Sequence, residues 1–293
     1  MDIWHRIGRI VRLSNLGTLI FFLLNFGLLF GAFLADINNW QSAVVIVVFY
    51  LLTVAISLSP VGEFLLAALA GARRIKRRDI KIRLIPLLEV VLSQALNETP
   101  TMVKSINLKI VNDKSPNAFA VGRKTICVTE GLLNLSDEEI MAIFAHELGH
   151  LAYKHITIQL LIGGGNLLIS GMLLLIKLVC WTISAIFALV ALSSLRLLLG
   201  IIITAIGSIY SIAMWLWTKF CMLFLMWSMR QNEFVADEYA YRLGYGNILA
   251  RLLDNQMCSN PENGLLKALY SSHPSSDDRI AKLQDLGATY GRY

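Results

Sequence analysis

The most informative stretch of the chain covers residues 136–150 and reads SDEEIMAIFAHELGH. Ser136 and Glu139 have the spacing of a capping box, in which each side chain accepts a hydrogen bond from the other residue's backbone N–H at the start of a helix. From Ile140 to Leu148, apolar residues recur at helical spacing. The stretch therefore predicts an amphipathic helix with a well-defined first turn.

Two histidines and a glutamate stand on that helix, namely His146, Glu147 and His150. Residues four apart share one face of a helix, so the two imidazoles can bind a single Zn²⁺ through nitrogens about 2.0–2.1 Å away. Glu147 reaches a water at the open position of such a site, where it can act as general base. Because H-E-x-x-H also occurs by chance, the alternative is a helix with solvated side chains.

A catalytic zinc site needs a third protein ligand and one open position. His155 does not fit the H-E-x-x-H-x-x-G-x-x-H pattern, because Tyr153 and Ile156 stand where that pattern has Gly and His. Glu233 and Asp237 lie four apart on a second predicted helix. We expect Glu233 to bind the metal and Asp237 to accept a hydrogen bond from a ligating histidine. The alternative for this pair is an ordinary solvated helix face.

The composition indicates a membrane protein. Only 16% of the 293 residues are charged and 56% are hydrophobic, whereas an average soluble domain is about 25% charged. Such a chain is not disordered, and its four cysteines form no disulfide framework. Residues 13–35 and 37–62 carry no charge, and residues 156–229 carry only three charges. Since a membrane helix needs about 20 apolar residues, each stretch is long enough to span.

Basic residues predict the orientation in the membrane. Three arginines precede the first apolar stretch, and residues 73–83 carry seven basic residues and one acidic residue. Basic flanks stay in the cytoplasm, so we expect the N-terminus and the segment from residue 73 onward to lie there, at the plasma or inner membrane. Attraction to anionic lipid explains the cluster better than nucleic-acid binding, because it adjoins a span and has no interleaved aromatic residues.

The pattern divides the chain into four predicted segments. They are a pair of transmembrane helices in residues 1–72, the first part of a catalytic domain in residues 73–155, a second transmembrane hairpin in residues 156–228, and the second part of the catalytic domain in residues 229–293. The candidate ligands His146 and Glu233 must meet on one side of the bilayer. We therefore expect two crossings, near residues 157–180 and 200–228, and leave the shape of residues 181–199 open.

Within residues 73–155 the patterns predict a helix and three strands ahead of the capped helix. Pro86 suits the first turn of a helix that runs toward Leu96. Alternating or β-branched residues predict strands near residues 106–110, 118–121 and 125–129. We expect these strands to form a small meander.

Taken with the motifs above, the chain resembles the HtpX-type membrane zinc metalloproteases. The resemblance covers nearly the whole chain and rests on HELGH at residues 146–150, ExxxD at residues 233–237, NAFAVG at residues 117–122, and SHP at residues 272–274 followed by Arg279. It implies an α-helical membrane protein with about four transmembrane helices and an α+β zincin-like catalytic domain of the gluzincin type.

The resemblance also implies roles for individual residues. His146, His150 and Glu233 would bind one Zn²⁺ per chain, and Glu147 would be the base. Asp237 and Arg279 would support the ligands by hydrogen bonding, and His273 would lie near the oxyanion that develops during catalysis. The substrate peptide would lie in extended form along an edge strand at Asn117, Ala118 and Phe119.

The residues predict zinc-dependent hydrolysis of peptide bonds, and the resemblance implies an endopeptidase that acts on membrane or misfolded proteins in protein quality control and stress response. Its partners would be protein or peptide substrates, among them membrane proteins, and the lipid bilayer, with no nucleic acid. One alternative is a CAAX-type prenyl-protein endopeptidase, which shares the site chemistry but is expected to have more spans. Another is a catalytically inactive zinc-binding membrane scaffold, against which the presence of Glu147 argues.

Overall fold

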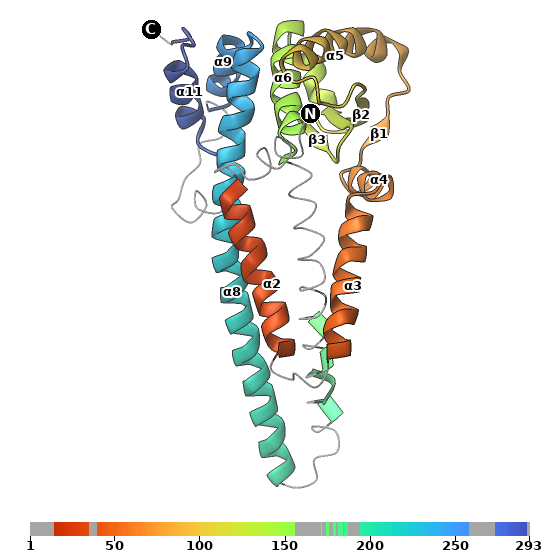
Figure 1. The fold of residues 1–293 in the computed structure, drawn as a ribbon, viewed down its shortest axis with the longest axis vertical. Helices are drawn as coiled ribbons and strands as arrows, with labels where there is room; N and C mark the ends of the chain where they lie inside the picture. Colours follow the sequence, from red (N-terminus) through yellow and green to blue (C-terminus); the bar gives the residue numbers. More distant parts are fainter. Residues whose placement is uncertain are drawn as a thin grey trace.

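A mixed helical and β-stranded head stands on a long helical stem in the computed structural model of the chain (Figure 1). The structure describes residues 15–34, 40–155, 171, 174–175, 178–179, 181–183, 185–186, 194–257 and 273–291. The continuous helices described in the stem are α2 (Leu16–Leu34), α3 (Trp40–Ser57) and the first part of α8 (Ser194–Arg242). The head holds the sheet and the end of α8, together with four helices, namely α5 (Arg78–Glu98), α6 (Asp137–Ala152), α9 (Gly246–Met257) and α11 (Ser276–Asp285).

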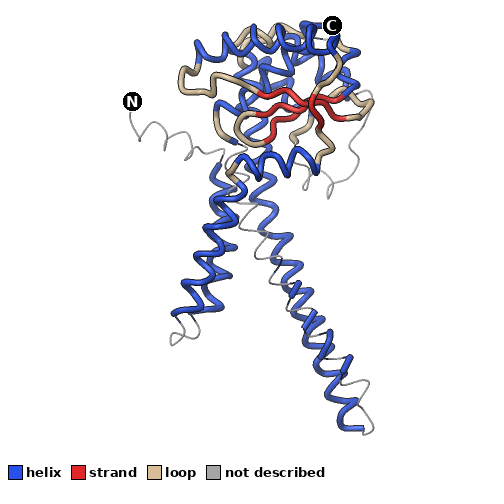
Figure 2. Tube along the Cα trace, turned by 90° about the vertical axis from the view of Figure 1, so that its right-hand side faces the viewer, coloured by secondary structure: helices blue, strands red, loops and turns tan. Residues whose placement is uncertain are grey.

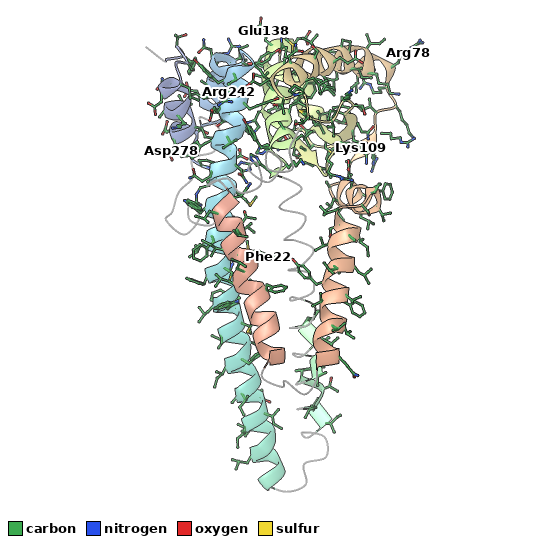
Figure 3. All side chains as sticks on the ribbon, in the orientation of Figure 1. Phe22, Arg78, Lys109, Glu138, Arg242 and Asp278 are labelled. Carbon is green, nitrogen blue, oxygen red and sulfur yellow. The ribbon has the colours of Figure 1, made fainter. Side chains whose placement is uncertain are left out.

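The surfaces of stem and head differ in polarity. Figure 3 labels Phe22 on the stem and five charged residues on the head, namely Arg78, Lys109, Glu138, Arg242 and Asp278. Large apolar side chains are exposed along the stem, for example Leu51, Ile206 and Ile212. In water such a surface would be costly, whereas contact with lipid tails explains it.

Two features of the stem bear on membrane crossing. Among the described residues, Gly200–Arg242 within α8 is long and apolar enough to cross a membrane, and the bent pair Val47–Ser57 and Pro60–Leu69, which meet at 68°, adds a second crossing if it counts as one span. The predicted crossing near residues 157–180 falls largely outside the described residues. The predicted number of four spans is therefore not confirmed.

Helix α8 joins stem and head without a break, since it has 49 residues from Ser194 to Arg242. Near the top of the stem α2 packs against it, where Thr18 Oγ1 donates a buried hydrogen bond of 2.7 Å to Ser228 Oγ. Residues 194–199, which belong to the segment whose shape the sequence leaves open, are thus part of one long helix. The predicted domain boundary at residue 229 lies inside this helix.

A helix that the sequence patterns do not predict lies between stem and head. Helix α4 (Pro60–Leu69) begins at the N-cap Ser59, whose side chain accepts from Gly62 N, and Pro60 occupies its first turn. Figure 2 shows a helix running across below the strands at this place. Its Glu63 side chain accepts hydrogen bonds from Thr125 Oγ1 (2.5 Å) and from the backbone N of Arg123 (3.2 Å), which ties α4 to the sheet.

The sheet has four strands in the order β1-β2-β4-β3. The strands are β1 (Arg73–Arg74), β2 (Asn107–Val111), β3 (Ala118–Val121) and β4 (Thr125–Thr129). Strand β2 pairs parallel with β4, and β3 pairs antiparallel with β4 as an edge strand. The predicted meander is therefore wrong, although the three predicted strands are confirmed. After β2, six residues lead to β3, which is not next to β2 in the sheet. The β3–β4 hairpin then places β4 between β2 and β3.

Helix α5 (Arg78–Glu98) starts eight residues earlier than predicted, so Pro86 lies inside it rather than in its first turn. Proline leaves the carbonyl of Ile82 without its helical partner. Both Pro86 and Ile82 are on the exposed face of α5, where water can satisfy that carbonyl. The helix ends at Glu98, two residues beyond Leu96, toward which it is predicted to run.

Helix α6 (Asp137–Ala152) confirms the capped helix. Ser136 and Glu139 form both hydrogen bonds of the capping box. The helix packs against α5, α8, α9 (Gly246–Met257) and strand β3, and its buried residues Ile140, Phe144 and Leu148 are part of the core of the head. Helix α11 (Ser276–Asp285) packs against α8 and α9. Helix α6 thus lies between an edge strand and the two helices that carry the other candidate site residues.

Candidate metal centre

Helices α6 and α8 approach each other closely at Gly149. A Cβ atom placed on Gly149 would lie 3.0 Å from the Cα of Ala236 and 3.1 Å from the Cβ of Tyr239. The absent side chain therefore allows the backbones of the two helices to come together. This close crossing places the histidine face of α6 opposite Glu233 on α8.

Three side chains converge where the helices cross. The candidate ligand atoms of His146, His150 and Glu233 all lie within 4.8 Å of one another. The two Nε2 atoms are 3.2 Å apart, Glu233 Oε1 lies 3.3 Å from His150 Nε2, and Glu233 Oε2 lies 3.6 Å from His146 Nε2. The structure thus brings together the three residues that the sequence predicts as metal ligands.

The donor set fits a divalent metal ion. Nδ1 of His146 lies 2.9 Å from Asp237 Oδ1. With the ring proton on Nδ1, beside this carboxylate, Nε2 presents a lone pair to the centre. Two imidazole nitrogens and a carboxylate therefore face one another, and they need a cation between them. The carboxylate of Glu233 also affects the protonation of His150. Burial alone would lower its pKa, but hydrogen bonding to Glu233 raises the pKa above its ordinary value.

Glu147 lies beside this group and is buried, with 6% of its surface exposed. Its Oε2 accepts a hydrogen bond of 2.7 Å from the backbone N of Ala120, on the edge strand β3. Burial raises the pKa of Glu147 above its ordinary value, which makes its carboxylate a better proton acceptor. The edge strand thus orients the predicted general base.

Asp237 and Arg279 form a buried pair behind the candidate ligands. Arg279 donates from Nε (2.7 Å) and from one terminal nitrogen (2.6 Å) to the two oxygens of Asp237. Its other terminal nitrogen lies 3.3 Å from Glu233 Oε2. Burial by itself would lower the pKa of Arg279. The negative charge of Asp237 outweighs this effect, so the pKa lies above its ordinary value. Both side chains lie where the sequence resemblance predicts support for the ligands.

His273 is brought to the open side of the centre. Its side chain is 65% exposed, and its Nδ1 lies 3.0 Å from Glu233 Oε2. Hydrogen bonding to Glu233 raises the pKa of His273. The imidazole is therefore placed at the rim of the site, with a tendency to carry a proton.

The predicted substrate strand differs in detail from the expectation. The backbone O of Asn117 accepts from Thr129 N (2.9 Å), and its N donates to Thr129 Oγ1 (2.8 Å). In an antiparallel pair the direction of the backbone groups alternates, so Phe119 also faces β4, whereas Ala118 and Ala120 face the open edge. The contact of Ala120 with Glu147 is not predictable from the sequence, because every residue except proline has a backbone N–H.

Comparison with known proteins identifies the family. The sequence model described as peptidase family M48 matches residues 87–286, which is more than half of the chain. The chain belongs to peptidase family M48. Because residues 87–286 contain the candidate metal centre, this membership supports a metalloprotease.

Named relatives agree with the M48 assignment. A protease HtpX homolog from Sulfurovum is 32% identical over 209 residues, which is 61% of this chain and 68% of the relative. One from Tropheryma whipplei is 27% identical over 246 residues, 75% of this chain and 77% of the relative. With a protease HtpX homolog 1 from Sulfurisphaera tokodaii the match is 32% identical but spans only 44% of the relative's length. The predicted resemblance to HtpX-type proteases is confirmed.

A solved structure shares the fold of the M48 chain. The crystal structure of Ste24p from S. mikatae matches with a TM-score of 0.51 and 17% sequence identity, over 96% of this chain and 66% of that one. At this identity the likeness concerns the fold alone. With 96% of this chain covered, the match includes both the stem and the head.

The close crossing at Gly149 yields a first prediction. Gly149→Val is expected to push α8 away from α6, because the new side chain would meet the backbone of Ala236. Overpacking of this kind typically costs about 1–3 kcal/mol. We expect a lower midpoint of thermal unfolding in detergent and less zinc per chain. The matched control is Gly27→Val on α2, where an added side chain meets nothing within 4 Å. Unchanged zinc content in Gly149→Val would contradict the account.

Proposed function

We propose that this M48 chain is a membrane-bound zinc endopeptidase that hydrolyses peptide bonds in membrane or misfolded proteins as part of proteolytic quality control. The observation that carries the proposal is the convergence of His146, His150 and Glu233 beside a buried Glu147 and an open edge strand. This combination offers a metal-binding set, a base and a place for an extended peptide within one small region.

In the proposed mechanism His146, His150 and Glu233 hold one zinc ion. When bound, the zinc supplies Lewis acidity that polarises the scissile carbonyl and acidifies water. Glu147 accepts a proton from the attacking water and later delivers it to the leaving amine. The Ala120 N–H keeps the Glu147 carboxylate in place during both transfers. His273, at the rim, donates a hydrogen bond to the oxygen that gains negative charge.

The substrate is proposed to add to the sheet at β3. An extended peptide can pair with the outward backbone groups of an edge strand, which provides affinity that depends little on sequence. The groups available on β3 are the N–H and C=O of Ala118 and the C=O of Ala120, because the Ala120 N–H is bonded to Glu147. The scissile bond would thus be held next to Glu147. Such binding suits unfolded segments, since a folded protein rarely offers a free extended strand.

Replacing Ala120 tests this role of the edge strand. Ala120→Pro removes the N–H that orients Glu147, and proline is tolerated in edge strands where the N–H does not serve the ladder. Losing a hydrogen bond to a charged group costs about 1.5–3 kcal/mol. We expect kcat for casein cleavage to fall roughly 10-fold or more, with zinc content unchanged. Ala120→Val, which keeps the N–H, is the control. Equal kcat values for the two variants would remove Ala120 from the mechanism.

The proposed topology has four spans, with the N-terminus and the head in the cytoplasm. It is supported by the uncharged stretches, by the basic residues beside them and by the exposed apolar surface of the stem. A cysteine introduced near residue 190 is expected to react with a membrane-impermeant reagent added from outside the cell. Labelling only from the cytoplasmic side would contradict the topology.

The proposed substrate class is tested in reconstituted vesicles. The experiment compares cleavage of an unfolded test protein that is anchored in the same vesicles with cleavage of its soluble form. We expect cleavage of both at internal peptide bonds, and faster cleavage of the anchored form because the site stands just above the stem. Removal of only the last three residues from a prenylated C-terminal peptide would favour a CAAX-type endopeptidase. No cleavage by a zinc-loaded protein would favour an inactive scaffold.

A further inference from the structure

We propose that His155 is a positioning residue of the metal centre, whose Nδ1 accepts a hydrogen bond from the Nδ1–H of His150 and thereby directs the Nε2 lone pair of His150 to the metal. The inference rests on the proposed metal site and adds a residue to it. No spacing pattern of zinc ligands includes His155, and none of the roles described above uses it.

His155 follows the end of α6 in a specific turn. The helix closes with hydrogen bonds from Tyr153 N to Gly149 O (3.1 Å) and from Lys154 N to Leu151 O (3.2 Å). Lys154 then has φ of 58°, a left-handed conformation that costs a residue with a side chain roughly 1–2 kcal/mol. This turn carries the chain back beneath the last turn of α6, to the side of His150. A strained residue next to a site is an indication of function.

The imidazole of His155 is buried and closely held. Only 1% of its surface is exposed. Its Nδ1 lies 3.1 Å from the Nδ1 of His150, and the two rings meet at 71° with their centroids 5.3 Å apart. The ring of Tyr153 also stacks on it, with the centroids 5.8 Å apart and the planes at 19°. A ring packed in this way has one orientation, so its Nδ1 is a fixed partner for His150.

The proton on the His150 ring decides whether His150 can bind a metal. Its Nε2 faces the centre, 3.3 Å from Glu233 Oε1. For Nε2 to give its lone pair to a cation, the proton of the neutral ring has to be on Nδ1. That Nδ1–H then needs an acceptor, and the Nδ1 of His155 provides it when the proton of His155 is on Nε2.

Each histidine ligand thus has its own partner. His146 has the carboxylate of Asp237, 2.9 Å from its Nδ1, and His150 has the imidazole of His155. Partners that fix the tautomer and direction of a ligating histidine typically contribute about 10- to 100-fold to metal affinity. His155 itself is not among the described residues whose ligand atoms converge within 4.8 Å, which are His146, His150 and Glu233.

Three substitutions of His155 in the full-length chain in detergent separate this role from simple packing. His155→Asn keeps an acceptor oxygen near the position of Nδ1. His155→Gln is equally polar but places its oxygen farther along the side chain, and His155→Leu removes the acceptor. The measurement is zinc affinity, obtained by competition with a chromophoric chelator. We expect affinity to fall about 10- to 100-fold in the Gln and Leu variants and to stay within a few-fold of the parent in the Asn variant.

Two controls keep the result specific. Ile140→Val makes a small cavity in the buried face of the same helix and is expected to leave zinc affinity unchanged. The absorption spectrum of the cobalt-substituted protein is expected to match the parent in His155→Asn and to change in His155→Gln. If His155→Leu does not fold, the comparison of Asn with Gln decides the question.

The outcomes distinguish this inference from the proposed function. Parental zinc affinity in the Gln and Leu variants would overturn the role of His155, and so would an equal loss in Asn and Gln. A parent protein that binds zinc but cleaves no casein would overturn the proposed function, while the three variants would still decide the role of His155. A parent that binds no zinc would overturn both.

Discussion

Glu147→Gln is expected to reduce kcat/KM for casein cleavage by about 10²- to 10⁴-fold, the usual contribution of a general base. The side chain is 6% exposed and accepts one hydrogen bond, from Ala120 N at 2.7 Å. Glutamine has the same shape, but its amide cannot accept a proton from water. Because Glu147 is not one of the three converging residues, the variant is expected to keep its zinc.

The matched control for this variant is Glu138→Gln, an exposed glutamate in the first turn of the same helix (Figure 3). It is expected to cleave casein at the parental rate. Zinc content is measured in both variants, so that a loss of metal is not mistaken for a loss of the base. Full activity in Glu147→Gln would contradict the proposed mechanism.

Glu233→Ala has the second large expected effect, on metal binding itself. The carboxylate lies 3.3 Å from His150 Nε2 and 3.0 Å from His273 Nδ1, so its removal leaves the two imidazoles without the carboxylate that completes the donor set. We expect zinc affinity to fall by more than the roughly 100-fold that loss of a supporting hydrogen bond costs, and casein cleavage to fall with it. Zinc per chain is measured after dialysis.

Glu238→Ala is the matched control on the same helix. Glu238 pairs with Arg242 on a partly exposed face, and such surface pairs contribute about 0–1 kcal/mol. This variant is expected to keep both zinc and activity. Stoichiometric, tightly bound zinc in Glu233→Ala, with the thermal unfolding profile unchanged, would mean that another residue is the third ligand.

Local signals account for most of the secondary structure that could be predicted. The capping box at Ser136 and the apolar periodicity behind it define α6, and the strands near β2, β3 and β4 follow from alternation and turns. The predicted start of α5 at Pro86 is wrong, because the missing N–H of this proline is tolerated within the helix on its exposed face. Helix α4 was missed although Ser59 and Pro60 form a typical helix start, since the uncharged stretch around them suggests one unbroken span.

The pairing of the strands could not be predicted from local sequence. Alternation indicates that a segment is a half-buried strand but not which neighbour it pairs with. The parallel pairing of β2 with β4 depends on how the chain between β2 and β3 passes the sheet. Its consequence for the site is large, because β3 becomes the edge strand whose Ala120 N–H reaches Glu147.

The candidate site was largely predictable because its chemistry depends on side chains at fixed helical spacing. His146 and His150 share a face of α6, and Glu233 and Asp237 share a face of α8. The contributions of Ala120 and His155 could not be found this way. One acts through its backbone, and the other depends on a left-handed turn at Lys154.

One continuous helix, α8, runs from the stem to the candidate site. Helix α8 carries exposed apolar residues along the stem and Glu233 at its upper end. Helix α4 in turn connects the end of α3 to the β3–β4 hairpin through Glu63. The stem is therefore joined to the candidate site by a continuous helix and by the hydrogen bonds of Glu63.

The most direct test of the central claim is metal removal and replacement in the purified, full-length protein. The measurement is casein cleavage as a function of zinc added per chain after chelation. We predict that cleavage is lost on chelation and returns in proportion to zinc, reaching its full value at one equivalent per chain. Undiminished cleavage by protein shown to be free of metal would contradict the account.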